Sequence, residues 1–243
     1  MRFFLALILC VGMSMAWSQS AFQENENHIR GETLNYKIKY GWFKIGEAKV
    51  HTDSEFHYFD NEPHYLVRFN LKTVGWLRIF ADLDILFESY VHADSFMPRT
   101  ALRSVKTSKK TNIQEDKFFY RDSIYVETFR REKEQTRVTT YPIVGEAFTD
   151  ALGTYMLIRG RELSDDKEEA ARFYIAHRIY EFAMIPEKSS GSDKERFYEV
   201  NFPPIKQFPR DKTSYAILGR EKNIPIEIKL STDNGNFYFV LDK

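Results

Sequence analysis

Residues 31–50, GETLNYKIKYGWFKIGEAKV, decide the fold of this chain. Apolar and polar residues alternate strictly over residues 34–40, which is the pattern of a β-strand with one buried face. A glycine ends this run, and a second alternating run follows with only Gly46 and Ala48, two small residues, at the start of its inner face. We expect a β-hairpin whose second strand leaves room for something bulky. That room holds either the protein's own core or a bound molecule.

The first twenty residues have the features of an export signal. Arg2 precedes an apolar run, residues 3–13, that is too short to span a membrane, and small residues follow at the spacing of a cleavage site. We expect a mature chain that begins at Gln19 or Ala21, located in the periplasm or, as the alternative, secreted. Cys10 lies inside the apolar run and follows a leucine where a small residue is needed, so lipid attachment is not expected.

The expected mature chain has no cysteine, so burial alone has to stabilise it. Residues 21–30 are polar and aperiodic, which indicates a flexible lead-in. Residues 31–243 then form a single domain of a size that suits an all-β fold. Aromatic residues make up 16% of the sequence, and this composition favours strands. No second apolar run is long enough to span a bilayer, so we expect a soluble mature protein.

The charges balance overall, with 35 basic and 35 acidic residues, and nucleic acid is therefore not an expected partner. The distribution is nevertheless uneven, because residues 99–137 contain eleven Lys or Arg and six Asp or Glu. This basic segment is either a contact face for an anionic surface or a set of strands with ordinary solvated faces.

Period-two alternation bounded by turn residues recurs along most of the chain. The expected strands cover residues 34–40, 48–52, 65–71, 85–91, 101–107, 114–120, 124–129, 172–177, 179–185, 196–202, 215–220, 224–230 and 237–241. Asn234 and Gly235 predict a hairpin turn before the last strand. Residues 76–83 change to helical spacing, and a longer helix is expected over about 149–160 with Thr149 as its N-cap.

Many short strands joined by turns form an antiparallel meander. So many strands cannot remain a flat open sheet, and the expected fold class is all-β, a meander curled into a barrel or half-barrel. The helix at 149–160 is expected to pack on it. The inward side chains of the first strand are expected to be Leu34, Tyr36, Ile38 and Tyr40.

Four segments carry a family resemblance: GETLNYKIKYGWFKIGEA (31–48), FMPRT (96–100), DALGTYMLIRGREL (150–163) and IPIEIKLSTDNGNFYFVL (224–241). Their order and spacing resemble a bacterial family of exported proteins known only as a domain of unknown function. That family typically begins GE-x-L-x-Y-x-I-x-Y-G, continues to G-E-A, and ends with P-x-x-I and a glycine hairpin. The resemblance covers nearly all of the expected mature chain and implies a curved antiparallel β-fold in the envelope. It carries over no catalytic residue.

Motifs for catalysis are missing from the sequence. There is no zinc-protease motif, nucleophile elbow or phosphate loop, and the expected mature chain has no thiol. His51, His57 and His64 could ligate zinc if turns brought them together, but we interpret them as surface histidines and expect no metal or cofactor. Asp82 and Asp84 would point the same way in a strand, about 7 Å apart, which is a weak basis for a carboxylate-dependent hydrolase.

The aromatic segments are the better candidate site. Trp42 and Phe43 in the first turn, like several residues of the helical segment, are apolar where loops are normally polar. The predicted ligand-binding residues are Trp42, Phe43, Gly46, Ala48, Trp76, Ile79 and Phe80. In the alternative interpretation, these side chains close the end of the barrel as ordinary core.

The leading hypothesis is a periplasmic protein that binds an apolar or amphipathic molecule, a lipid or a lipoprotein acyl chain, in the cavity of a curved sheet. The alternative is a non-catalytic structural or interaction module of an envelope assembly, with residues 99–137 as its contact face. An enzyme is not expected. An empty apolar cavity would favour the first hypothesis, and a filled barrel with an apolar surface patch would favour the second.

Overall fold

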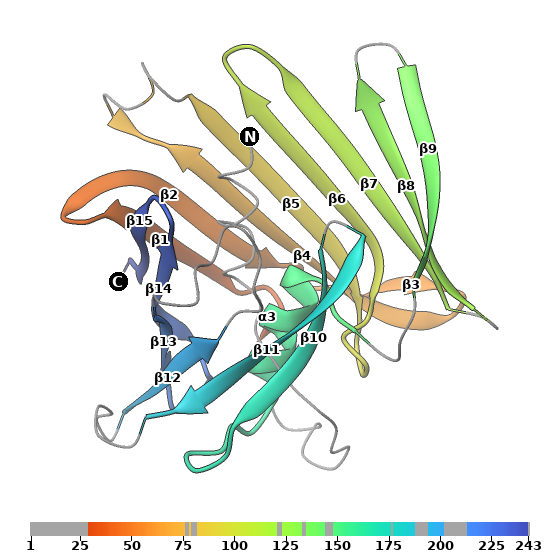
Figure 1. Ribbon diagram of the computed structural model, residues 1–243. Helices are drawn as coiled ribbons and strands as arrows, with labels where there is room; N and C mark the ends of the chain where they lie inside the picture. The colour runs from red at the N-terminus through yellow and green to blue at the C-terminus, as the bar shows by residue number, and fades with distance from the viewer. Residues whose placement is uncertain are drawn as a thin grey trace.

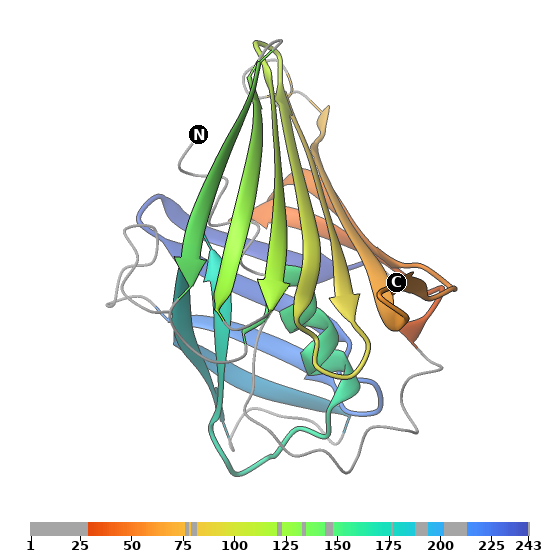
Figure 2. The ribbon, with the colours of Figure 1, turned by 90° about the vertical axis from the view of Figure 1, so that its right-hand side faces the viewer.

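The computed structural model is a large antiparallel β-sheet that curves around the helix α3 (Ala151–Gly160), as Figures 1 and 2 show. It describes residues 29–75, 78, 82–120, 123–132, 135–143, 148–175, 177–187, 194–201 and 213–242. The predicted export signal at 1–20 and nearly all of the lead-in at 21–30 lie outside the described residues. The strands are β1 (Thr33–Tyr40), β2 (Phe43–Thr52), β3 (His57–Phe59), β4 (Glu62–Thr73), β5 (Leu83–His92), β6 (Pro98–Thr107), β7 (Thr111–Tyr120), β8 (Ile124–Glu132), β9 (Gln135–Ile143), β10 (Glu169–Ile175), β11 (Arg178–Pro186), β12 (Glu195–Asn201), β13 (Ser214–Gly219), β14 (Pro225–Thr232) and β15 (Gly235–Leu241).

The sheet has 15 strands in the described part of the chain, and their order places the first strand, β1, and the last, β15, side by side at its centre. The order is β10-β11-β12-β13-β14-β15-β1-β2-β4-β5-β6-β7-β8-β9, with β3 paired to β4 beside this path. Strands β9 and β10, from the middle of the sequence, are therefore the two edges. This confirms the expected all-β, antiparallel, barrel-like fold, and the sheet stays open because no ladder joins β9 to β10 within the described residues.

Side chains hold the two edges together. His177, in the turn between β10 and β11, has a left-handed backbone (φ 67°), and its ring stacks on Tyr141 of β9 with centroids 3.7 Å apart. Arg130 of β8 donates a hydrogen bond of 3.0 Å to His177 Nε2. Ahead of α3, Thr149 forms an isolated parallel bridge with Phe173 of β10. A small buried cluster completes the seam: Ala101, Phe118, Val126, Phe148 and Tyr174.

Helix α3 fills the inside of the curve, where it packs against β4, β5 and β10. All ten of its residues are buried. The predicted N-cap, Thr149, is wrong by one residue, because the carboxylate of Asp150 accepts the backbone N–H of Gly153 at 2.7 Å. The hydroxyl of Thr149 instead bonds to that of Thr154, at 2.5 Å. Asp150 also accepts a 2.5 Å hydrogen bond from Ser89 of β5, so the helix start is fastened directly to the sheet.

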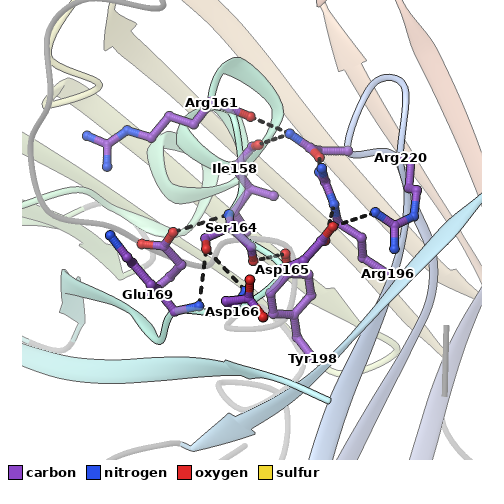
Figure 3. Close-up of polar contacts among 11 residues, drawn as sticks. Ile158, Arg161, Ser164, Asp165, Asp166, Glu169, Arg196, Tyr198 and Arg220 are labelled. Carbon is purple, nitrogen blue, oxygen red and sulfur yellow. Dashed lines mark hydrogen bonds and ion pairs between the residues drawn. The ribbon is translucent and has the colours of Figure 1, made fainter. Parts of the chain in front are cut away.

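The C-terminal end of α3 is fastened by a polar network (Figure 3). The side-chain amide of Asn223 donates to the carbonyls of Ile158 (3.1 Å) and Arg161 (2.5 Å), which the helix leaves unpaired. Arg196 of β12 donates to Asn223 Oδ1 at 3.0 Å and to Asp165 at 2.8 Å. The turn between β13 and β14 therefore caps the helix and joins it to the C-terminal half of the sheet.

A charge is buried beside this end of the helix. Arg159 is 1% exposed, pairs with Glu32, and donates to the carbonyl of Lys222 at 2.8 Å and to the hydroxyl of Tyr155 at 2.8 Å. Because the guanidinium is paired and hydrogen-bonded, its burial carries no uncompensated charge.

The first strand follows the predicted alternation except at its end. Leu34, Tyr36 and Ile38 are buried in the core, but Tyr40 is 43% exposed, so its assignment to the interior is wrong. Tyr40 is the last residue of β1 and follows an irregularity in the β1–β2 register between Ile38 and Lys39; its ring packs on Phe237 while its hydroxyl donates to the Asn234 carbonyl at 2.7 Å.

Candidate functional site

The tip of the β1–β2 hairpin is a two-residue turn that exposes aromatic side chains. Tyr40 pairs directly with Phe43, so Gly41 and Trp42 form the turn, and Gly41 has the positive φ (59°) that the first position of a type II′ turn requires. Trp42 is 89% exposed and Phe43 is 59% exposed. Their rings contact each other edge to face, with centroids 6.2 Å apart. The hairpin thus presents an apolar pair of rings to solvent.

Of the other predicted site residues, the two that the structure describes do not join this pair around a cavity. Gly46 and Ala48 are buried on the inner face of β2. Their register partners on β1 are Ile38 and Tyr36, both core residues, and the Ile38 side chain already lies against Gly46. The remaining predicted residues lie outside the described residues: Trp76, Ile79 and Phe80.

Basic residues lie at the same end of the sheet as the aromatic tip. Strands β1, β4 and β6 run toward this end and their antiparallel neighbours run back, so the β1–β2 and β6–β7 turns share it. Figure 1 shows both turns along the upper and left margin of the sheet, away from α3. Lys106, Lys109 and Lys110 at the β6–β7 turn are exposed, and no ion pair to them occurs among the described residues. We call these three lysines, Trp42 and Phe43 the aromatic–basic end.

Residues 35–242 match a family model described as a protein of unknown function, DUF3108. The chain belongs to DUF3108. This confirms the expected membership of a family of unknown function. No curated protein matches the DUF3108 chain.

A solved structure shares the fold of the DUF3108 chain. It is the crystal structure of a β-barrel-like protein of the domain of unknown function DUF1849 from Brucella abortus, with a TM-score of 0.52 and 11% identity over 87% of this chain and 95% of that chain. At this identity the similarity shows the fold alone. Within the described residues, no helix combines the length and the apolarity that crossing a membrane requires.

Histidines gather at the opposite end of the DUF3108 sheet. His57 pairs in register with His64, and His64 pairs with His92 on the next strand. His51 and His57 both contact Asp53, at 3.4 and 3.0 Å. No group of three or more metal-ligating side chains occurs among the described residues. The prediction of a surface histidine is wrong for His64, which is 3% exposed because neighbouring rings, including those of Phe59 and His92, cover it.

Asp53 is the ionic centre of this end. It accepts from Nη1 of Arg68 at 2.5 Å, and Arg68 also bonds to Glu88 at 2.7 Å. Burial alone would raise the pKa of Asp53, but hydrogen bonds from His57 and Arg68 outweigh burial and hold that pKa below its usual value. Asp53 therefore stays ionised and positions the imidazole rings of His51 and His57.

The two carboxylates considered for hydrolysis are each paired with a cation. Asp82 accepts from Arg78 at 3.0 Å, and Asp84 lies 3.6 Å from Lys72. A general acid and base need carboxyl groups that share a substrate, whereas these two are engaged in separate exposed ion pairs on the DUF3108 sheet.

Proposed function

We propose that this protein is an exported, non-catalytic envelope protein that binds lipid at a membrane surface through its aromatic–basic end. The observation that carries the proposal is the 89% exposure of Trp42 in the two-residue turn of the β1–β2 hairpin. Tryptophan favours the interface between water and lipid, where its apolar ring and its indole N–H are both accommodated.

The chemistry of the aromatic–basic end matches an anionic lipid surface. Each fully buried aromatic ring contributes about 1.5–3 kcal/mol. Each lysine near an anionic leaflet contributes about 1 kcal/mol. Trp42, Phe43 and the three lysines together support weak, reversible and salt-sensitive attachment, because the lysine contribution is screened within about 10 Å at moderate ionic strength.

The packing of the interior is the reason to place the lipid outside the sheet. Helix α3 packs in one buried cluster with residues of β1, β2, β4, β5 and β10 to β15, and the space beside Gly46 is already occupied by Ile38. The proposed ligand is still an amphipathic lipid, as in the hypothesis from the sequence. It contacts the hairpin tip and not a cavity inside the sheet. The three lysines belong to the basic segment 99–137, which the alternative hypothesis from the sequence named as a contact face. In this proposal, that segment contributes to the contact with the membrane.

Vesicle binding tests this function. The full chain is mixed with vesicles of phosphatidylethanolamine and phosphatidylglycerol, and binding is measured by co-sedimentation and by quenching of tryptophan fluorescence with brominated lipid. The double variant Trp42→Ser and Phe43→Ser should lose most of the binding, and Lys109→Glu with Lys110→Glu should reduce it at low salt.

The control is Tyr58→Ser, because Tyr58 is 68% exposed but lies on β3 at the opposite end of the sheet. It should bind vesicles as the parent does. Every variant carries the same N-terminal segment, so an apolar leader contributes equally to all of them. Equal binding by the parent and by the Trp42 and Phe43 double variant would overturn the proposal.

A further inference from the structure

A pocket of about 440 Å³ lies at the histidine end of the sheet, at the ends of β4 to β7. Its volume is within the range of small-molecule sites. Most of its lining is polar: His64, His92, Glu62, Asp60, Ser95 and Arg99. Met97, Pro98 and Phe119 form an apolar wall. The pocket is separate from the aromatic–basic end, because β4 and β5 run the length of the sheet between the two.

The hydrogen bonds fix the proton on each imidazole. His64 Nδ1 lies 2.9 Å from the carbonyl oxygen of Glu62, which can only accept, so Nδ1 carries the proton and Nε2 is a bare acceptor. His92 Nδ1 receives the backbone N–H groups of Asp94 and Ser95, both at 3.2 Å, so its Nε2 carries the proton. Burial lowers the pKa of His64, which keeps that ring neutral.

One imidazole thus offers an acceptor nitrogen and the neighbouring imidazole offers a donor nitrogen. They are register partners on adjacent strands, and their ring centroids lie 5.2 Å apart. Nε2 of His64 has no hydrogen-bond partner among the described residues. A hydroxyl group both donates and accepts, so one ligand hydroxyl, or two neighbouring ones, can satisfy both nitrogens.

The charges around the imidazoles disfavour an anionic ligand. Arg99 donates to Asp60 at 2.8 Å, which pairs one acid with the one arginine of the lining. Glu62 is the remaining acid, and its carboxylate lies 3.7 Å from His92 Nε2. Because Asp60 neutralises Arg99, the negative charge of Glu62 is left over, and an anion would be repelled by it.

We infer that this pocket binds a saccharide unit. The hydroxyl groups of a sugar match the alternating donors and acceptors of His64, His92, Glu62 and Ser95. Its C–H face matches the apolar wall formed by Met97, Pro98 and Phe119. A site built to pair with hydroxyl groups discriminates against ligands that lack them, because its polar atoms then gain no partner from the ligand.

Ligand-observed NMR and calorimetry on the full chain test this inference. The probes are glucose, N-acetylglucosamine, cellobiose and chitobiose, with inorganic phosphate and ethanolamine as the anionic and cationic probes. At least one sugar should bind. His64→Asn keeps an amide donor near the place of Nδ1 but removes the Nε2 acceptor, and it should weaken sugar binding about tenfold or more.

Three further variants distinguish a lost ligand contact from a folding defect. Glu62→Gln changes a group at the exposed mouth of the pocket, should not disturb folding, and should also weaken the sugar. His51→Asn alters an imidazole outside the pocket and should bind the sugar as the parent does, and so should Trp42→Ser with Phe43→Ser. The inference is overturned if no sugar binds, if phosphate or ethanolamine binds more tightly than every sugar, or if folded His64→Asn and Glu62→Gln both bind like the parent.

Discussion

The side chain of Ile38 fills the space that Gly46, its register partner on the neighbouring strand, leaves open. A Cβ atom at position 46 would lie 3.3 Å from Cδ1 of Ile38 and 2.9 Å from the carbonyl oxygen of Lys72. The small residues of the 31–50 segment therefore make room for the protein's own core.

Gly46→Ala should lower the free energy of unfolding by about 1–3 kcal/mol, because the added methyl group overlaps a backbone carbonyl that cannot move freely. Gly219→Ala is the matched control, since its nearest contacts would be ordinary ones of 3.7 and 3.8 Å. Its unfolding free energy should stay within about 0.5 kcal/mol of the parent. Urea denaturation measures both, and equal values for the two variants would contradict the packing described.

Ala48→Phe should also destabilise the fold, by about 1–3 kcal/mol, because Ala48 is 4% exposed between Tyr36 and Leu71 in a filled interior. Lys49→Phe, on the exposed outer face of the same strand, should have little effect. Thermal melting distinguishes them. Unchanged stability of Ala48→Phe would indicate a hollow beside β2.

Asp150 predicts a pH dependence of stability. Burial raises its pKa to about 6 in the folded state, whereas hydrogen bonds from Ser89 and from the N–H groups of Gly153 and Leu152 limit the rise. Between an unfolded pKa near 4 and a folded pKa of about 6, the folded state binds more protons. Ionising Asp150 should therefore cost about 3 kcal/mol of stability as the pH rises through this window.

Asp150→Asn keeps a good N-cap and removes this titration. The difference in unfolding free energy between parent and variant should change between about pH 4 and pH 6 in favour of the variant as the pH rises. Denaturation series at several pH values measure it. A difference that is independent of pH would show that Asp150 keeps an ordinary pKa.

We expect His177 to stabilise the contact between the two edges of the open sheet, where the turn after β10 meets β8 and β9. His177→Gly accepts the left-handed backbone but removes the stacking on Tyr141 and the hydrogen bond from Arg130. Backbone amides of β9 and β10 should then exchange with solvent faster, while those of α3 stay protected. Hydrogen exchange followed by mass spectrometry measures this, and unchanged exchange in both strands would mean that the stacked pair does not hold the seam.

Most strands could be predicted because one of their faces is buried, which imposes alternation. Strand β9 could not. Its residues QTRVTTYPI are largely exposed on both faces at the edge of the sheet, so no apolar period marks it. Asp60 and Asn61, at φ 52° and 67°, form the tight turn between β3 and β4, where the sequence indicated a turn over residues 57–64 but not the short strand β3 within it.

The candidate sites were visible to different degrees. The aromatic tip could be predicted, because a glycine between Tyr40 and the pair Trp42 and Phe43 is a local sequence signal for a turn that carries aromatic side chains. The pairing of His64 with His92 could not, because it depends on the register between β4 and β5, which alternation alone does not fix. The positions of Gly46 and Ala48 were correct, but small residues do not reveal which neighbour fills the space beside them.

The pairing of β1 with β15 has a consequence for synthesis. Strands emerge from the ribosome in chain order, so β1 has β2 as its neighbour early but cannot gain its second neighbour until Gly235–Leu241 has been made. Contacts this distant in sequence close slowly. Until β15 has been made, the edge of β1 that faces away from β2 has unpaired backbone N–H and C=O groups and can pair with other chains. The time until β15 is made therefore determines how long each new molecule is prone to aggregation. Chains truncated before β15 should be degraded faster in cells than the full chain.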